Sequence, residues 1–93
     1  MSAARLQLSL HGTVQGVGFR WFVRRHAQLL GVTGWVRNDP NGRRVEVVAE
    51  GPRASLEQLL DRVREGPSGA QVSQVEAEWL DSTGEFGQFR ISH

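Results

Sequence analysis

Apolar residues in this chain recur first at every second position, then at helical spacing, and later at every second position again. This succession restricts the folds that the chain can adopt. Residues 5–11 alternate between apolar and polar side chains, which predicts a half-buried strand. Residues 12–18 contain three glycines and predict an irregular loop. Apolar or aromatic side chains then recur at helical spacing in residues 19–30, at Phe19, Phe22, Val23, His26, Ala27 and Leu30. A strand, a glycine-rich loop and a helix are therefore expected in direct succession.

The rest of the chain predicts a hairpin, a second helix and two further strands. Residues 32–38 and 43–51 are strand-like and flank a turn at residues 39–42, after a first helix that ends at Gly31. A helix is expected between Pro52 and Gly66. Residues 72–80 alternate again, and a last short strand contains Phe89 and Ile91. This β-α-β-β-α-β order with an extra C-terminal strand predicts an α+β, ferredoxin-like sandwich, in which an antiparallel sheet of four to five strands carries two helices on one face.

Size and composition exclude several classes of protein. Ninety-three residues suffice for one compact domain, so residues 1–93 are expected to form a single one. The absence of cysteine excludes a thiolate nucleophile, a disulfide framework and a cysteine-ligated zinc site. The absence of lysine excludes a Schiff base and the lysine-containing phosphate loop of NTPases. All eleven basic residues are arginine, whose planar guanidinium suits phosphate.

Charge and hydropathy argue against nucleic acid and membrane partners. A net charge of +1 is too small for the basic surface that nucleic-acid binders usually carry. An RNA-recognition module of the same topology would need aromatic side chains in its central strands, and residues 43–50 contain none. No apolar stretch approaches the length of a membrane span or the core of a signal peptide. A cytoplasmic protein is expected.

The segment from His11 to Arg20 is the strongest candidate for a binding site. Glycines let successive backbone N–H groups turn toward one point, and the start of a helix adds free donors and positive potential, which together favour an anion such as phosphate. Arg20, in the first helical turn, could close this cradle with a bidentate pair. The alternative is a plain connector followed by a solvated arginine.

Asn38 stands just before the predicted turn and allows two interpretations. Asparagine at such a place most often forms the turn by bonding to its own backbone. Its amide can also accept from and donate to one water molecule, and so orient a nucleophile. The three histidines, His11, His26 and His93, lack the spacing of metal ligands, so no metal site is predicted.

Two motifs of this chain resemble those of the acylphosphatase family. Residues 12–20 match the family's Gly-x-Val-Gln-Gly-Val-x-Phe-Arg signature. Residues 34–38, Gly-Trp-Val-Arg-Asn, resemble its Gly-aromatic-Val-basic-Asn pattern and are followed by Gly42, Val45 and Gly51, with one extra residue between Gly42 and Val45. That extra residue falls in the predicted hairpin tip, where added length costs little.

The resemblance implies an enzyme that hydrolyses the carboxyl–phosphate bond of acyl phosphates to a carboxylate and inorganic phosphate, without a metal or cofactor. It implies that Arg20 binds the phosphate and that Asn38 positions the attacking water. The cradle would be lined by backbone amides of the loop, from Gln15, Gly16, Val17, Gly18 and Phe19. A free phosphate or sulfate anion is expected to fit the same site, and the protein is expected to be a monomer.

One alternative to an enzyme stays open. Acylphosphatase-like domains also occur at the start of larger hydrogenase-maturation carbamoyltransferases. A chain of this kind could therefore bind phosphate without turning a substrate over.

Overall fold

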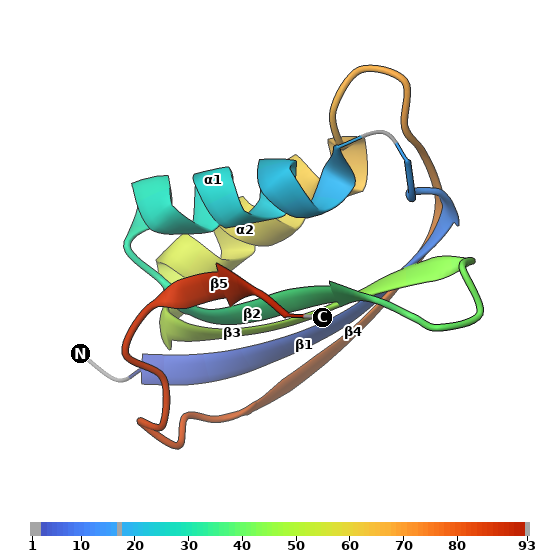
Figure 1. Ribbon diagram of the computed structural model, residues 1–93. Coiled ribbons are helices and arrows are strands. Elements are labelled where there is room, and N and C mark those ends of the chain that lie inside the picture. The colour runs from blue at the N-terminus through green and yellow to red at the C-terminus, as the bar shows by residue number, and fades with distance from the viewer. Residues whose placement is uncertain (1–2, 17, 93) are drawn as a thin grey trace.

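Two helices lie on one face of a five-stranded sheet in the computed structural model, which describes residues 3–16 and 18–92 (Figure 1). In chain order the elements are β1 (Ala3–Thr13), α1 (Phe19–Leu30), β2 (Thr33–Asn38), β3 (Arg44–Pro52), α2 (Arg53–Glu65), β4 (Gln71–Asp81) and β5 (Phe89–Ile91). The strand order is β4-β1-β3-β2-β5. The predicted α+β, ferredoxin-like class is confirmed.

The sheet is mixed, because its last strand, β5, runs parallel to its neighbour β2, whereas all other neighbouring strands are antiparallel. β1 pairs antiparallel with β3 and β4, and β2 pairs antiparallel with β3. β5 joins the free edge of β2 in parallel, with Trp35 opposite Arg90. The three pairings among β1 to β4 therefore follow the antiparallel prediction, while the fifth strand adds one parallel pair that short-range patterns cannot reveal.

The first strand is longer than the sequence predicts. β1 continues through Gly12 and Thr13, which the glycine pattern assigns to the loop. A bulge between His11 and Gly12 shifts the register, after which Gly12 pairs with Val72 and Thr13 with Gln71 of β4. Glycine within a strand is common at such a bulge. The loop between β1 and α1 is therefore confined to residues 14–18.

The first helix is fixed to the sheet by one buried side at helical spacing. Phe19, Val23 and Ala27 are buried against the sheet, and the backbone N–H of Gly31 ends the helix by donating to Ala27 O and Gln28 O. Each large apolar side chain buried in this way contributes about 1.5–3 kcal/mol. Because Phe19 is the first residue of α1 and only 1 % exposed, its burial also fixes the end of the preceding loop.

The second helix completes the core. Leu56, Leu59, Leu60 and Val63 of α2 are buried, opposite the inward faces of β1 and β3. In residues 3–16 and 18–92, neither helix is long and apolar enough to cross a membrane.

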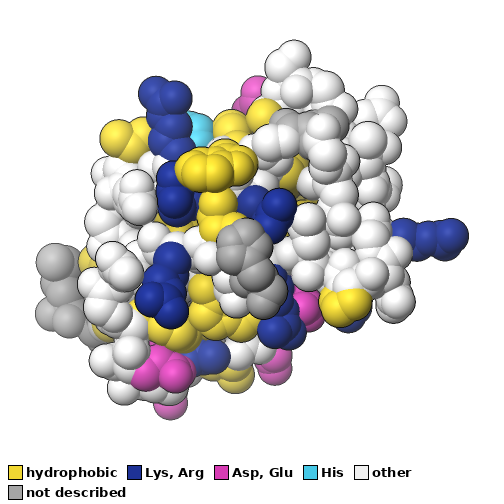
Figure 2. Space-filling view, in the orientation of Figure 1, with side chains coloured by type: hydrophobic (Ala, Val, Ile, Leu, Met, Phe, Trp, Pro, Cys, Tyr) yellow, Lys and Arg dark blue, Asp and Glu magenta, His cyan; other side chains and the backbone are white. Residues whose placement is uncertain are grey.

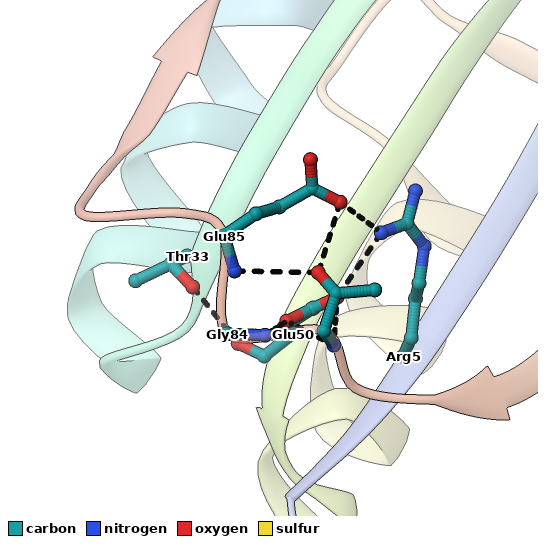
Figure 3. A network of polar contacts seen from close by, with 6 residues as sticks. Arg5, Thr33, Glu50, Gly84 and Glu85 are labelled. Carbon is teal, nitrogen blue, oxygen red and sulfur yellow. Dashed lines mark hydrogen bonds and ion pairs between the residues drawn. The ribbon is translucent and has the colours of Figure 1, made fainter.

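A buried carboxylate on β3 holds the connection between β4 and β5. Glu50 is 4 % exposed and accepts hydrogen bonds from the backbone N–H and the hydroxyl of Thr83 and from the N–H of Gly84 (Figure 3). Its Oε2 also lies 3.1 Å from the guanidinium of Arg5, which binds Glu85 as well. Burial raises the pKa of Glu50, but these hydrogen bonds outweigh it and hold the pKa below its ordinary value.

The Glu50 network predicts a stability that depends on pH. A carboxyl whose pKa is depressed by folding stabilises the protein above the pKa of the unfolded chain, and this contribution is lost as the pH falls through the folded-state pKa. We expect Glu50→Gln to lower the free energy of unfolding at pH 7 by about 1–3 kcal/mol, since a charged acceptor of several hydrogen bonds is removed. Urea unfolding at pH 7 measures the loss of stability in Glu50→Gln, and urea unfolding in acid measures how stability depends on pH.

Glu57→Gln is the matched control, because Glu57 is exposed and pairs with Arg53 only across one turn of α2. This substitution should change the free energy of unfolding by less than about 0.5 kcal/mol. The stability of Glu50→Gln should also fall less steeply than that of the wild type below about pH 5. Parallel pH curves for the wild type and Glu50→Gln would contradict the assignment.

Candidate active site

A hollow of about 270 Å³ lies where the loop after β1 meets the end of β2. It is lined by Val14, Gln15, Gly16, Gly18, Phe19, Arg20, Trp21 and Asn38. The structure therefore brings Arg20, Asn38 and the described part of the predicted cradle to one place. Val17, which the sequence also assigns to the cradle, lies outside the described residues.

The loop opens the start of α1 toward this hollow. Gly16 and Gly18 have φ angles of 76° and 74°, in the left-handed region that residues with a Cβ rarely adopt. Gly18 is the N-cap of α1, and its carbonyl accepts from the N–H of Phe22 at 3.0 Å. Within the described residues no side chain caps the helix start, and its first turn carries no acidic residue. The free N–H groups and the positive end of the helix are thus left for an anion.

Arg20 has the position and the unpaired charge that such an anion needs. It is half-buried in the first turn of α1 and lines the hollow. Among residues 3–16 and 18–92, no ion pair or side-chain hydrogen bond involves its guanidinium, whereas Arg5 and Arg37 are each paired with a carboxylate. A planar guanidinium beside free backbone N–H groups can bind phosphate through two parallel hydrogen bonds.

Asn38 faces the hollow with a polar atom that lacks a partner. Its Oδ1 is buried, and within the described residues no group donates a hydrogen bond to it. A buried acceptor without a donor costs about 1–3 kcal/mol, so the site favours a water or ligand that donates there. The turn-forming interpretation of Asn38 is wrong, because Asp39 forms the turn: Asn41 N–H donates to Asp39 Oδ1 at 3.0 Å and Gly42 N–H to Asp39 O at 2.9 Å.

The side chain of Gln15 connects the two halves of the site. Its Nε2 donates to Asp39 O at 3.4 Å and to Arg44 O at 3.1 Å, at either end of the β2–β3 connection. These partners lie 24 and 29 residues further along the chain. Sequence patterns assign Gln15 to the cradle only through its backbone amide, because they do not show which distant carbonyls its side chain will meet.

The two histidines that the structure describes, His11 and His26, have partners away from the hollow, and His93 lies outside the described residues. His26 Nδ1 lies 3.1 Å from a guanidinium nitrogen of Arg62, which can only donate, so the ring nitrogen accepts. Burial and then the charges of Arg62 and Arg25 lower the pKa of His26. His11 pairs with Glu76 at 2.8 Å on the other side of the sheet. In the part of the chain that the structure describes, no three acidic or histidine side chains gather to bind a metal.

A larger hollow of about 540 Å³ lies on the sheet face opposite the helices. Each arginine that lines it, Arg5, Arg37 and Arg44, is paired with a carboxylate, as Arg37 Nε is with Glu46 Oε1 at 3.0 Å. Little unpaired positive charge is left there for a phosphate. The smaller hollow beside Arg20 is therefore the better anion site.

Comparison with known proteins identifies the family of this chain. A family model described as Acylphosphatase matches residues 6–91. The chain belongs to the acylphosphatase family. An acylphosphatase of Salinibacter ruber is 48 % identical, over 94 % of this chain and 90 % of that one. The crystal structure of an acylphosphatase from Bacillus subtilis superposes with a TM-score of 0.92 and 33 % identity, over 97 % of this chain and 99 % of that one.

A larger protein shares the fold as one of its parts. The structure of full-length HypF in the phosphate- and nucleotide-bound form matches with a TM-score of 0.81 and 29 % identity, over 98 % of this chain but only 12 % of that one. The acylphosphatases, in contrast, match over nearly their whole length. The chain is thus a hydrolase of acyl phosphates, and its substrate is a small molecule.

Proposed function

We propose that Arg20 and the backbone amides of the loop bind the phosphate of the substrate, while Asn38 holds the attacking water. The observation that carries this proposal is the buried Oδ1 of Asn38, which faces the hollow without a donor among the described residues. A water bound there would donate one hydrogen to Oδ1 and keep its lone pairs for the phosphorus. The amide of Val17 remains part of the proposed cradle as a prediction.

The substrate explains why so few groups suffice. Attack by water forms a new oxygen–phosphorus bond while the bond from phosphorus to the acyl oxygen breaks. The leaving group is a carboxylate, a stable anion near neutral pH, so no general acid has to protonate it. The proton of the attacking water passes to an oxygen of the substrate phosphate. The products are a carboxylic acid anion and inorganic phosphate.

The charge that stabilises the transition state comes from Arg20 and from the start of α1. Phosphoryl transfer proceeds through a loose transition state with negative charge on the equatorial oxygens, and fixed donors around these oxygens lower its energy. The guanidinium and the free N–H groups of the first helical turn supply such donors. We therefore propose a reaction that needs no metal or cofactor. A monomeric state and a cytoplasmic location stay predictions.

The metal and anion predictions can be tested together by following the loss of benzoyl phosphate by absorbance. The rate should be unchanged by an excess of EDTA. Inorganic phosphate and sulfate should inhibit competitively, because each fits the same cradle. Sodium chloride at matched ionic strength is the control and should inhibit less. Loss of activity in EDTA with recovery on adding a divalent metal, or no competition by phosphate, would contradict the proposal.

A further inference from the structure

A groove continues from the proposed phosphate hollow along the exposed side of α1. It encloses about 490 Å³ and shares Gly18 and Trp21 with the hollow. Its remaining lining comes from Phe22, Arg25, His26 and Leu29. Figure 2 shows hydrophobic side chains at the surface over α1, with arginine side chains around them. The groove therefore begins where the proposed phosphate site ends.

The groove is lined by apolar groups that the fold does not use. Trp21 is 60 % exposed and Leu29 is 68 % exposed, although both are large hydrophobic side chains. They gain little from folding, and contiguous exposed apolar surface next to a site commonly marks a binding surface. The guanidinium carbon of Arg24 lies 4.2 Å from the centroid of the Trp21 ring, a cation–π contact.

Two aromatic rings form the floor of the groove. The rings of Phe22 and His26 pack with their centroids 4.3 Å apart. Burial and the nearby charges of Arg62 and Arg25 lower the pKa of His26, which favours the neutral imidazole. A flat apolar group can therefore pack against the rings of Trp21 and Phe22.

We propose that the acyl group of the preferred substrate is aromatic or an extended apolar chain, and that it packs on Trp21 in this groove. This inference rests on the proposed function, since the phosphate end must first be held beside Arg20. The acyl group then leaves the hollow past Gly18 and Trp21, which line both spaces. A small acyl group, such as acetyl, does not reach Leu29 and gains little from the groove.

The test compares kcat/KM for benzoyl phosphate and acetyl phosphate in the wild type and in Trp21→Ala. The intrinsic reactivity of the two compounds cancels when their ratio is compared between variants. Trp21→Ala should lower the benzoyl-to-acetyl ratio by about tenfold, mainly through KM, because one aromatic contact is lost and the chemical step is unchanged. Trp21→Phe keeps an aromatic ring and should restore the ratio to within about threefold of the wild type.

Leu80→Ala is the matched control, because Leu80 is 40 % exposed and lies on β4 outside both spaces. It should leave the ratio unchanged. A ratio in Trp21→Ala within about twofold of the wild type would overturn the inference. An equal loss for both substrates would also overturn it, since the indole would then support the hollow. Failure of the wild type to hydrolyse either compound would instead remove the proposed function itself.

Discussion

Replacement of Arg20 by alanine is expected to lower kcat/KM for benzoyl phosphate by about a hundredfold to a thousandfold. Within the described residues the guanidinium is unpaired at the edge of the hollow, so it is available to bind the substrate phosphate in the ground state and in the transition state. Both kcat and KM should therefore change. Steady-state kinetics measures the effect, and competitive inhibition by inorganic phosphate reports the loss of anion affinity directly.

Two further variants separate a specific role of Arg20 from a general effect of charge. Arg20→Lys keeps the positive charge but loses the planar fork, and should recover only part of the activity. Arg64→Ala removes the same charge from the exposed side of α2 and should keep the activity within about twofold of the wild type. Equal losses in Arg20→Ala and Arg64→Ala would show that the guanidinium acts only through the net charge.

The elements that local patterns define were predicted most closely. The expected helix at residues 19–30 coincides with α1, because its apolar spacing and the glycines at both ends are local features. The extension of β1 through Gly12 was not predicted, since it depends on pairing with Val72, far along the chain. The parallel pairing of β5 with β2 is equally distant and leaves no periodic signal.

In the site, too, the features that are local in the sequence were predicted and those that depend on distant contacts were not. The glycine loop and Arg20 are adjacent in sequence, so their convergence at the start of α1 could be expected. Asn38 lies at the end of β2, on a different element from the loop and Arg20. Its turn-forming interpretation was wrong because Asp39 forms the turn instead. Trp21 stands next to Arg20, yet helical spacing alone could not show that its ring lines both the hollow and the groove along α1.

Replacement of Asn38 by alanine should separate catalysis from stability. We expect kcat for benzoyl phosphate to fall by about a hundredfold to a thousandfold, because the water loses the acceptor that orients it. KM should change much less, since Arg20 and the loop amides still hold the phosphate. The free energy of unfolding should not fall by more than about 1 kcal/mol below that of the wild type, because Oδ1 of Asn38 has no donor among the described residues.

Asn41→Ala is the control for this variant, because Asn41 is exposed in the turn and bonds to Asp39 through its backbone N–H. It should keep both kcat and stability. Asn38→Asp preserves the shape of the side chain but places a negative charge beside the phosphate, so it should be at least as slow as Asn38→Ala. A marked loss of stability in Asn38→Ala, with kcat kept, would make Asn38 a structural residue. A rise in KM alone would instead assign it to substrate binding, because a group that only orients the water acts on the chemical step.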